Sequence, residues 1–161
     1  AVSPDQTLRS MVFWLMGDLG QPELPLWEPV ILLVGTLLAY LLAREINVLA
    51  RGGSQAAAFG VSVERLRLLL FLLASLLTAT AVTLAGSVGF VGLVVPHMIR
   101  LMGGSDHRLL VPASVLLGGG LLTLSDILAR TLLAPQQLPV GVVTALLGVP
   151  LFLYLLQRSG R

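Results

Sequence analysis

The chain of 161 residues contains no cysteine and no lysine, and only 11% of its residues are charged. The lack of cysteine excludes disulfides, cysteine-ligated zinc, iron–sulfur clusters and thiol catalysis. An ordinary soluble domain carries about 25% charged residues, so this chain has too few charges to cover a water-exposed surface. With 56% hydrophobic residues, it has the composition of a protein whose main solvent is lipid.

The basic residues give no sign of a nucleic-acid partner. All ten are arginines, they are spread along the chain, and the formal net charge is only +2. A nucleic-acid interface would need a basic stripe, commonly with aromatic side chains between the cations. We therefore expect no nucleic acid among the partners and look to membrane topology for the role of the arginines.

Uncharged apolar runs predict four membrane crossings, at about residues 29–43, 68–85, 109–125 and 140–156. A glycine-rich bend at 86–92 divides one long run and leaves a short helix at about 94–102, with Pro96 in its first turn. A short interfacial helix is expected at 3–16, with Ser3 as its N-cap. Another is expected at 55–59, outside the bilayer. The predicted fold is all-α: a multi-span helical membrane protein with about four transmembrane helices plus short interfacial and re-entrant helices.

The arginines divide unequally between the two sides of this topology. Arg9 and Arg130 fall on one side, and the other eight fall opposite, in the 44–67 loop, around the 103–108 turn and at the C-terminus. Cytoplasmic loops of membrane proteins carry an excess of basic residues. We therefore expect the 44–67 loop and the C-terminus to face the cytoplasm.

The polar residues do not form a catalytic constellation, and the sequence has no metalloprotease, nucleophile-elbow or Walker A pattern. His97 is either a ligand or proton carrier, or a helix-start histidine satisfied by a neighbouring helix. His107 is expected in a solvated turn. Asp126 and Arg130 share a helix face at i,i+4. They either pair at the interface, or Arg130 awaits an acidic group on an outside partner.

The 44–67 loop is longer than a solvated connection needs, and its hydrophobic residues include Ile46, Leu49, Phe59 and Val61. An exposed apolar face on a short helix is commonly a docking surface. The alternative is a loop helix that lies on the membrane surface.

From this loop onward the sequence resembles the permease subunits of FecCD-type ABC importers, which take up iron–siderophores, haem and cobalamin. The matching blocks run in family order: INVLARG at 46–52 with Ala56 and FGV at 59–61, LAGSVGFVGLVVPH at 84–97, DHRLLVP at 106–112, DILAR at 126–130, LPVGVVTA at 138–145 and GVPLF at 148–152. Upstream, FWLMG at 13–17 fits the family's WxxG element. Together these blocks cover almost the whole chain.

The resemblance implies roles for particular residues. The 46–61 loop would form the coupling helices that sit in a cleft of a separate ATP-binding subunit, with Asn47, Leu49, Gly52, Ala56 and Gly60 at the matched positions. Arg130 would receive a carboxylate from the substrate-binding protein. The last span would line the translocation path near the axis of a permease homodimer, with Gly141, Thr144 and Gly148 as its candidate residues. Arg51 and Gly53 depart from the family pattern, so the polar contacts to the ATPase are expected to differ.

Family permeases have about twice this length, so the chain is expected to be the C-terminal half of an importer's transmembrane domain. The expected function is translocation of a metal chelate across the bacterial inner membrane. The permease would have no catalytic residues, cofactor or metal site of its own, and ATP would be hydrolysed by the partner chain. Alone, this half should not transport. The alternative reading is a helical membrane scaffold or interaction subunit that transports nothing.

Overall fold

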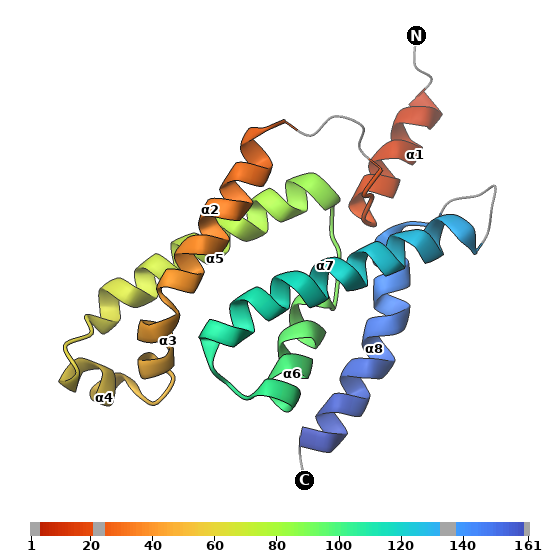
Figure 1. The fold of residues 1–161 in the computed structure, drawn as a ribbon. Coiled ribbons are helices and arrows are strands. Elements are labelled where there is room, and N and C mark those ends of the chain that lie inside the picture. Colours follow the sequence, from red (N-terminus) through yellow and green to blue (C-terminus); the bar gives the residue numbers. More distant parts are fainter. Residues whose placement is uncertain (1–3, 21–24, 133–137, 160–161) are drawn as a thin grey trace.

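The fold, taken from a computed structural model, is all-helical over the residues that the structure describes, 4–20, 25–132 and 138–159. Eight helices follow one another within those ranges and no strand occurs there (Figure 1). They are α1 (Pro4–Leu15), α2 (Trp27–Leu41), α3 (Ala43–Leu49), α4 (Gly53–Ala58), α5 (Val63–Ala85), α6 (Val91–Gly103), α7 (His107–Thr131) and α8 (Val140–Ser159). The predicted all-α class is confirmed. The expected cap at Ser3 lies outside the described residues.

Two helices, α5 and α7, are long and apolar enough to cross a membrane. The consecutive pair α2 and α3 passes the same test as one span bent by 53°, while α6 and α8 count as shorter apolar helices. Only 6% of the most apolar window of α5 is buried within the chain. Such apolar surface is stable in lipid or against further protein and not in water, so the helices form a multi-span membrane protein.

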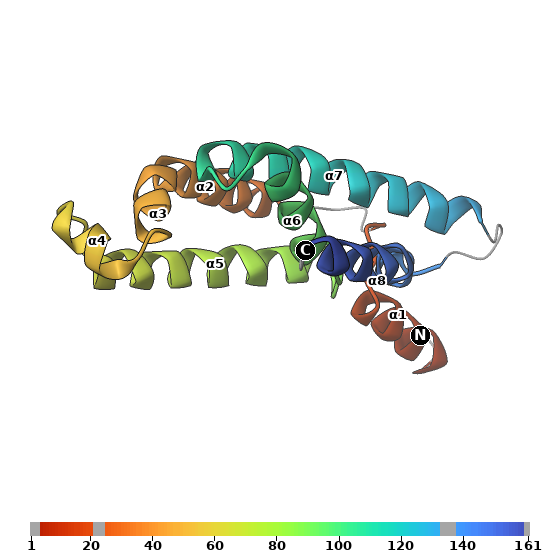
Figure 2. The ribbon, with the colours of Figure 1, turned by 90° about the horizontal axis from the view of Figure 1, so that it is seen from below.

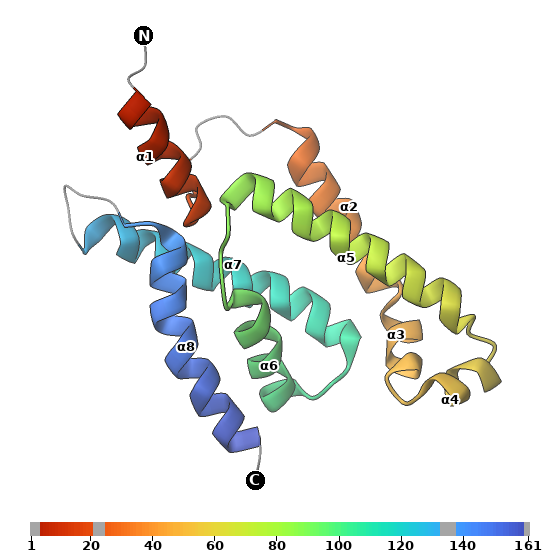
Figure 3. The ribbon, with the colours of Figure 1, turned by 180° about the vertical axis from the view of Figure 1, so that it is seen from behind.

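Helix α7 lies at the centre of the packing. It contacts α2, α3, α6 and α8, while α2 packs against α5. Figure 2 shows α2 and α7 in one layer and α5 in another. Seen from behind, α3 and α4 lie together at one end of the molecule and α1 and α8 at the other (Figure 3). The buried core is small: Val95, Ile99 and Leu110 join α6 to α7, and Ala129, Val140 and Val143 join α7 to α8.

The segment at 44–67 is more helical than expected. It holds the whole of α4, most of α3 and the start of α5, where one short helix was predicted. Helix α5 begins at Val63, so Arg65 and Arg67 lie in its first turns. Long arginine side chains at the end of a span can reach the interface with their charge while their stems cover apolar surface, which explains how a helix can begin before the apolar run does.

The bend between α5 and α6 is confirmed at the predicted place. Gly86 has φ +68° at the C-terminal end of α5, and Phe90 has φ +66° at the start of α6. A left-handed conformation is easy for glycine and costly for a residue with a Cβ. Helix α6 begins at Val91, earlier than predicted, which puts Pro96 in the interior of α6 and not in its first turn.

Candidate functional site

The end of the molecule formed by α3 and α4 carries the predicted coupling residues. Gly52 (φ +126°) separates α3 from α4, and Gly60 (φ +79°) lies between α4 and α5. Both positions have nothing within 4 Å of an added Cβ, so the backbone angle and not crowding requires glycine. The two glycines let the chain turn sharply twice, and these turns set α4 apart as a separate short helix.

The five predicted coupling residues are not equally accessible. Gly60 is exposed, whereas Asn47, Leu49 and Gly52 are half-buried. Ala56 is fully buried, with an exposed fraction of 0%, although its neighbours in α4 are exposed. The methyl group of Ala56 therefore packs α4 against the rest of the chain, and the outer surface of α4 is formed by the residues beside it.

Asn47 holds α3 to the start of α7. Its Nδ2 donates to Asp106 Oδ1 (2.7 Å), and its Oδ1 accepts from the backbone N–H of His107 (2.9 Å). His107 Nδ1 lies 2.8 Å from the same oxygen, and that contact requires a proton on Nδ1. His107 is half-buried in this contact, which corrects the expectation of a purely solvated turn.

Asp106 is both the partner of Asn47 and the N-cap of α7. Its Oδ1 also accepts from the backbone N–H of Arg108 (2.9 Å), which satisfies one of the free donors at the helix start. The Arg108 N–H and then the Asn47 amide lower the pKa of the Asp106 carboxyl below its usual range. A carboxyl with a lowered folded pKa stabilises the fold at neutral pH, and that stabilisation is lost as the pH falls through the lowered pKa.

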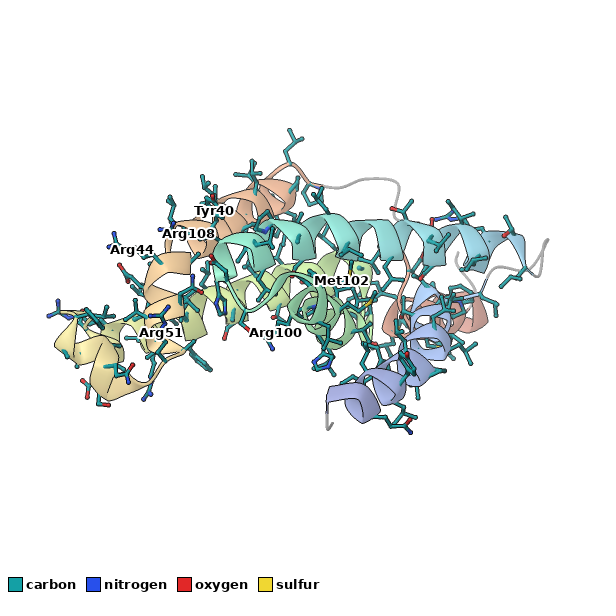
Figure 4. The ribbon with its side chains drawn as sticks, turned by 60° about the horizontal axis from the view of Figure 1, so that its bottom comes forward. Tyr40, Arg44, Arg51, Arg100, Met102 and Arg108 are labelled. Carbon is teal, nitrogen blue, oxygen red and sulfur yellow. The ribbon has the colours of Figure 1, made fainter. Side chains whose placement is uncertain are left out.

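Two polar pockets open at this end of the molecule. One, of about 430 Å³, is lined by Asn47, Ala50, Arg51, Ser105 and Asp106. The other, of about 400 Å³, is lined by residues of α3 and of the turn between α4 and α5, among them Arg44, Phe59 and Ser62. Figure 4 shows Arg44, Arg51 and Arg108 at the end of the molecule that α3 and α4 occupy. This end is therefore a polar and basic surface with recesses that a partner's side chains could enter.

The predicted path residues of α8 lie on one face of the helix, at i, i+3 and i+7, but their surroundings differ. Gly141 lines an apolar groove of about 670 Å³, with Val142, Ala145, Leu146 and Val149 as further linings from α8. Thr144 is buried and donates from Oγ1 to the carbonyl of Gly141 (3.0 Å). Gly148 is buried against Phe90. Sequence reasoning did not identify the groove-lining side chains, because a wholly apolar helix has no polar face to orient it.

Three glycines from separate segments meet where α1 ends, α5 turns and α8 begins. We call Gly17, Gly86 and Gly141 the glycine junction. A Cβ on Gly86 would collide with the carbonyl oxygen of Trp14, and one on Gly141 with that of Met16. Backbone hydrogen bonds cross the same point, from Asp18 N–H to Ala85 O and from Val140 N–H to Gly17 O, each 3.0 Å. The close backbone approach is what glycine permits here.

Asp126 and Arg130 form the predicted i,i+4 pair at the far end of α7, with Arg130 Nε 2.9 Å from Asp126 Oδ2. The arginine side chain is 43% exposed. Its Nη2 lies 3.6 Å from where a Cβ on Gly20 would stand, beside the turn in which Asp18 Oδ1 accepts from the Gly20 N–H (2.8 Å). An exposed ion pair of this kind contributes little stability, so Arg130 can exchange its partner at small cost.

His97 Nε2 is buried and has no hydrogen-bond partner within the described part of the chain. The expected partner from a neighbouring helix is therefore not found there. Over the same residues, no three side chains from His, Cys, Asp or Glu gather in a way that could hold a metal ion.

Helices able to cross a bilayer, an apolar groove along α8 and two short helices projecting at one end define a multi-span helical membrane protein. Comparison of the sequence with known families identifies the family. The chain belongs to the FecCD transport family, whose family model matches residues 1–158.

Named relatives show the same relationship. The chain is 44% identical to the hemin transport system permease protein HmuU of Yersinia pestis, over 99% of this chain and 50% of that protein. It is 43% identical to the uncharacterized ABC transporter permease protein YvrB of Bacillus subtilis (96% and 44% covered). It is 44% identical to the cobalamin import system permease protein BtuC of Halobacterium salinarum (97% and 42% covered). The chain thus spans about half the length of the curated relatives it matches.

A solved structure gives the same result for the fold. It is described as an inward-facing conformation of a metal-chelate type ABC transporter, and it matches with a TM-score of 0.80 and 34% sequence identity. The match covers 97% of this chain and 51% of that one. The order and packing of the helices therefore match those of about half of that transporter chain.

Proposed function

We propose that this chain forms the C-terminal half of the transmembrane domain of an ABC importer that translocates a metal chelate. The candidate cargoes are an iron–siderophore complex, haem and cobalamin, since relatives carry names for hemin and cobalamin transport. The observation that carries the proposal is the joining of membrane-crossing helices by α3 and α4 at one end, in a chain of this family. The groove along α8 has an apolar lining, which would let a large cargo pass without strong polar contacts to the wall.

ATP hydrolysis belongs to a separate subunit in this proposal. That subunit binds the end of the molecule formed by α3 and α4, and its closure on ATP moves these helices. The two polar pockets and the exposed arginines there support such a contact. The side of the membrane that holds this end faces the cytoplasm, because eight of the ten arginines fall on that side in the predicted topology. The protein resides in the bacterial inner membrane. A second permease copy completes the path beside α8, and a substrate-binding protein docks at the Arg130 end.

The ATPase contact predicts a difference between two adjacent cysteine variants. In the full-length permease that contains this chain, Ala57→Cys should crosslink to the ATP-binding subunit, because residue 57 is on the exposed side of α4. Ala56→Cys should give little crosslink, because residue 56 is fully buried. This half of the permease contributes no competing cysteine, and any cysteine in the other half is replaced first. The product is measured by gel shift after treatment with a short bifunctional reagent.

The same pair of variants separates the proposed importer from a scaffold that lies on the bilayer. A scaffold would give no ATPase crosslink at either position, and that result would overturn the coupling role. Equal crosslinking at both positions would contradict the burial of Ala56.

If the substrate-binding protein docks at Arg130, reversing the charge at this position should weaken the docking. Arg130→Glu should weaken binding of the substrate-binding protein about tenfold or more, because like charges across an interface repel. Asp126→Asn is the matched control: it removes the intramolecular partner of Arg130 and keeps the cation, so docking should be equal or tighter. Binding is measured by surface plasmon resonance on full-length permease in nanodiscs. Unchanged docking in Arg130→Glu would leave the pair with a structural role only.

A further inference from the structure

The contact between α3 and α7 uses the whole carboxamide of Asn47. Its amide nitrogen donates to Asp106 Oδ1, while its oxygen accepts from both the backbone and the ring of His107. The same Asp106 oxygen caps α7 through the Arg108 N–H. We call Asn47, Asp106 and His107 the α3–α7 bridge. Each of its bonds joins a residue of α3 to the first turn of α7, almost 60 residues further along the chain.

The chemistry of the bridge requires an amide at position 47. An aspartate there could still accept from His107, but it would have no donor for Asp106 and would place a second carboxylate against the first. An apolar side chain would leave the His107 N–H without its acceptor and would remove one of the two donors to Asp106 Oδ1. At position 106, by contrast, asparagine keeps an acceptor oxygen that can receive both the Arg108 N–H and the Asn47 amide.

The bridge lies between the proposed ATPase contact and the centre of the membrane domain. Helix α7 has 25 residues, which corresponds to a rod of about 37 Å. It packs against α6 and against α8, the helix that supplies much of the groove lining. A displacement of α3 that is passed to the first turn of α7 therefore reaches the groove through directly packed helices.

We propose that Asn47 is a positioning residue that couples α3 to α7, and not a direct contact of the ATP-binding subunit. Movement of α3 and α4 on ATP binding passes through the α3–α7 bridge to α7 and from α7 to α8. This inference rests on the proposed function, since it assumes the ATPase binds at α3 and α4. Three residues within the permease, Asn47, Asp106 and His107, then pass the movement of α3 to α7.

The test measures the movement of α7 directly and needs no knowledge of the cargo. Spin labels are placed at Leu72 on α5 and Leu124 on α7 in the full-length permease, assembled with its ATP-binding subunit; both side chains are more than half exposed. The distance between the labels is measured by pulsed EPR without nucleotide and with ATP and vanadate. In the permease with the wild-type α3–α7 bridge, the distance between the two labels should change on ATP binding. Asn47→Asp should remove that change while leaving association with the ATPase intact.

Two further variants make the outcome specific. Ser105→Ala, in the same turn but outside the bridge, should keep the full ATP-dependent change, and so should Asp106→Asn. Adding Asp106→Asn to Asn47→Asp removes the charge repulsion and should restore part of the change. The proposal would be overturned if Asn47→Asp kept the full ATP-dependent change in distance, or if the double variant recovered none of it. Loss of ATPase association in Asn47→Asp would also overturn it, because that result would show a direct contact between Asn47 and the ATPase. Failure of the wild-type permease to bind the ATPase would refute the proposed function itself.

Discussion

Gly86→Ala should lower the free energy of unfolding by roughly 3 kcal/mol or more. The loss combines the cost of a left-handed backbone at a residue with a Cβ and the cost of a steric collision. Gly86 has φ +68°, and an added Cβ would overlap the carbonyl oxygen of Trp14. A backbone oxygen cannot move aside as a flexible side chain can. The effect is measured from the unfolding transition of the permease in detergent micelles titrated with a denaturing surfactant.

Two alanine substitutions control for this result. Gly141→Ala collides with the Met16 oxygen, but Gly141 does not have a positive φ, so it isolates the steric part of the cost. Gly119→Ala, in the middle of α7, meets nothing within 4 Å and should stabilise the helix by up to about 1 kcal/mol. If all three variants shifted the transition equally, the close approach at the glycine junction would be incorrect.

Gly148→Ala should destabilise the protein by about 2 kcal/mol through a single neighbour, Phe90. An added Cβ would lie 2.5 Å from Phe90 Cβ, and Phe90 is already held at φ +66°. Because a Cβ is fixed by its backbone, the ring cannot rotate away to relieve the overlap. The strained backbone of Phe90 would have to move, and with it the start of α6.

A double-mutant cycle tests this single contact. Phe90→Gly removes both the overlapping carbon and the cost of the left-handed backbone. In that background Gly148→Ala should be close to neutral, which gives a coupling energy of about 2 kcal/mol between the two positions. The same loss from Gly148→Ala with and without Phe90 would show that the crowding at residue 148 comes from elsewhere.

Several features of the fold followed from the sequence because each depends on local chemistry. The run at 68–99 has no formal charge and is too long for one ordinary span, and its glycines occur where it must turn. The structure bends there, at Gly86 to Phe90. Gly52 and Gly60 lie at the two breaks between α3, α4 and α5, where glycine is the residue that a positive φ favours. The Asp126–Arg130 pair followed from helical spacing alone.

Other features could not be predicted, because they depend on which faces of distant helices meet. Asn47 and Asp106 are 59 residues apart, and no periodicity in either segment relates them. The burial of Ala56 and the packing of Gly148 against Phe90 are likewise set by tertiary register. In a chain that is apolar on most sides, hydrophobic pattern does not distinguish lipid-facing from protein-facing residues. For this reason the path and coupling residues remain predictions, drawn from the resemblance.

The glycine junction also fixes an order of assembly. The N–H of Val140 at the start of α8 bonds to the carbonyl of Gly17, just after α1, so this contact joins two segments that are far apart in the sequence. The Gly17 oxygen therefore gains this partner only after α8 has been synthesised. Closure of the junction follows synthesis of both segments and cannot begin with α1 alone.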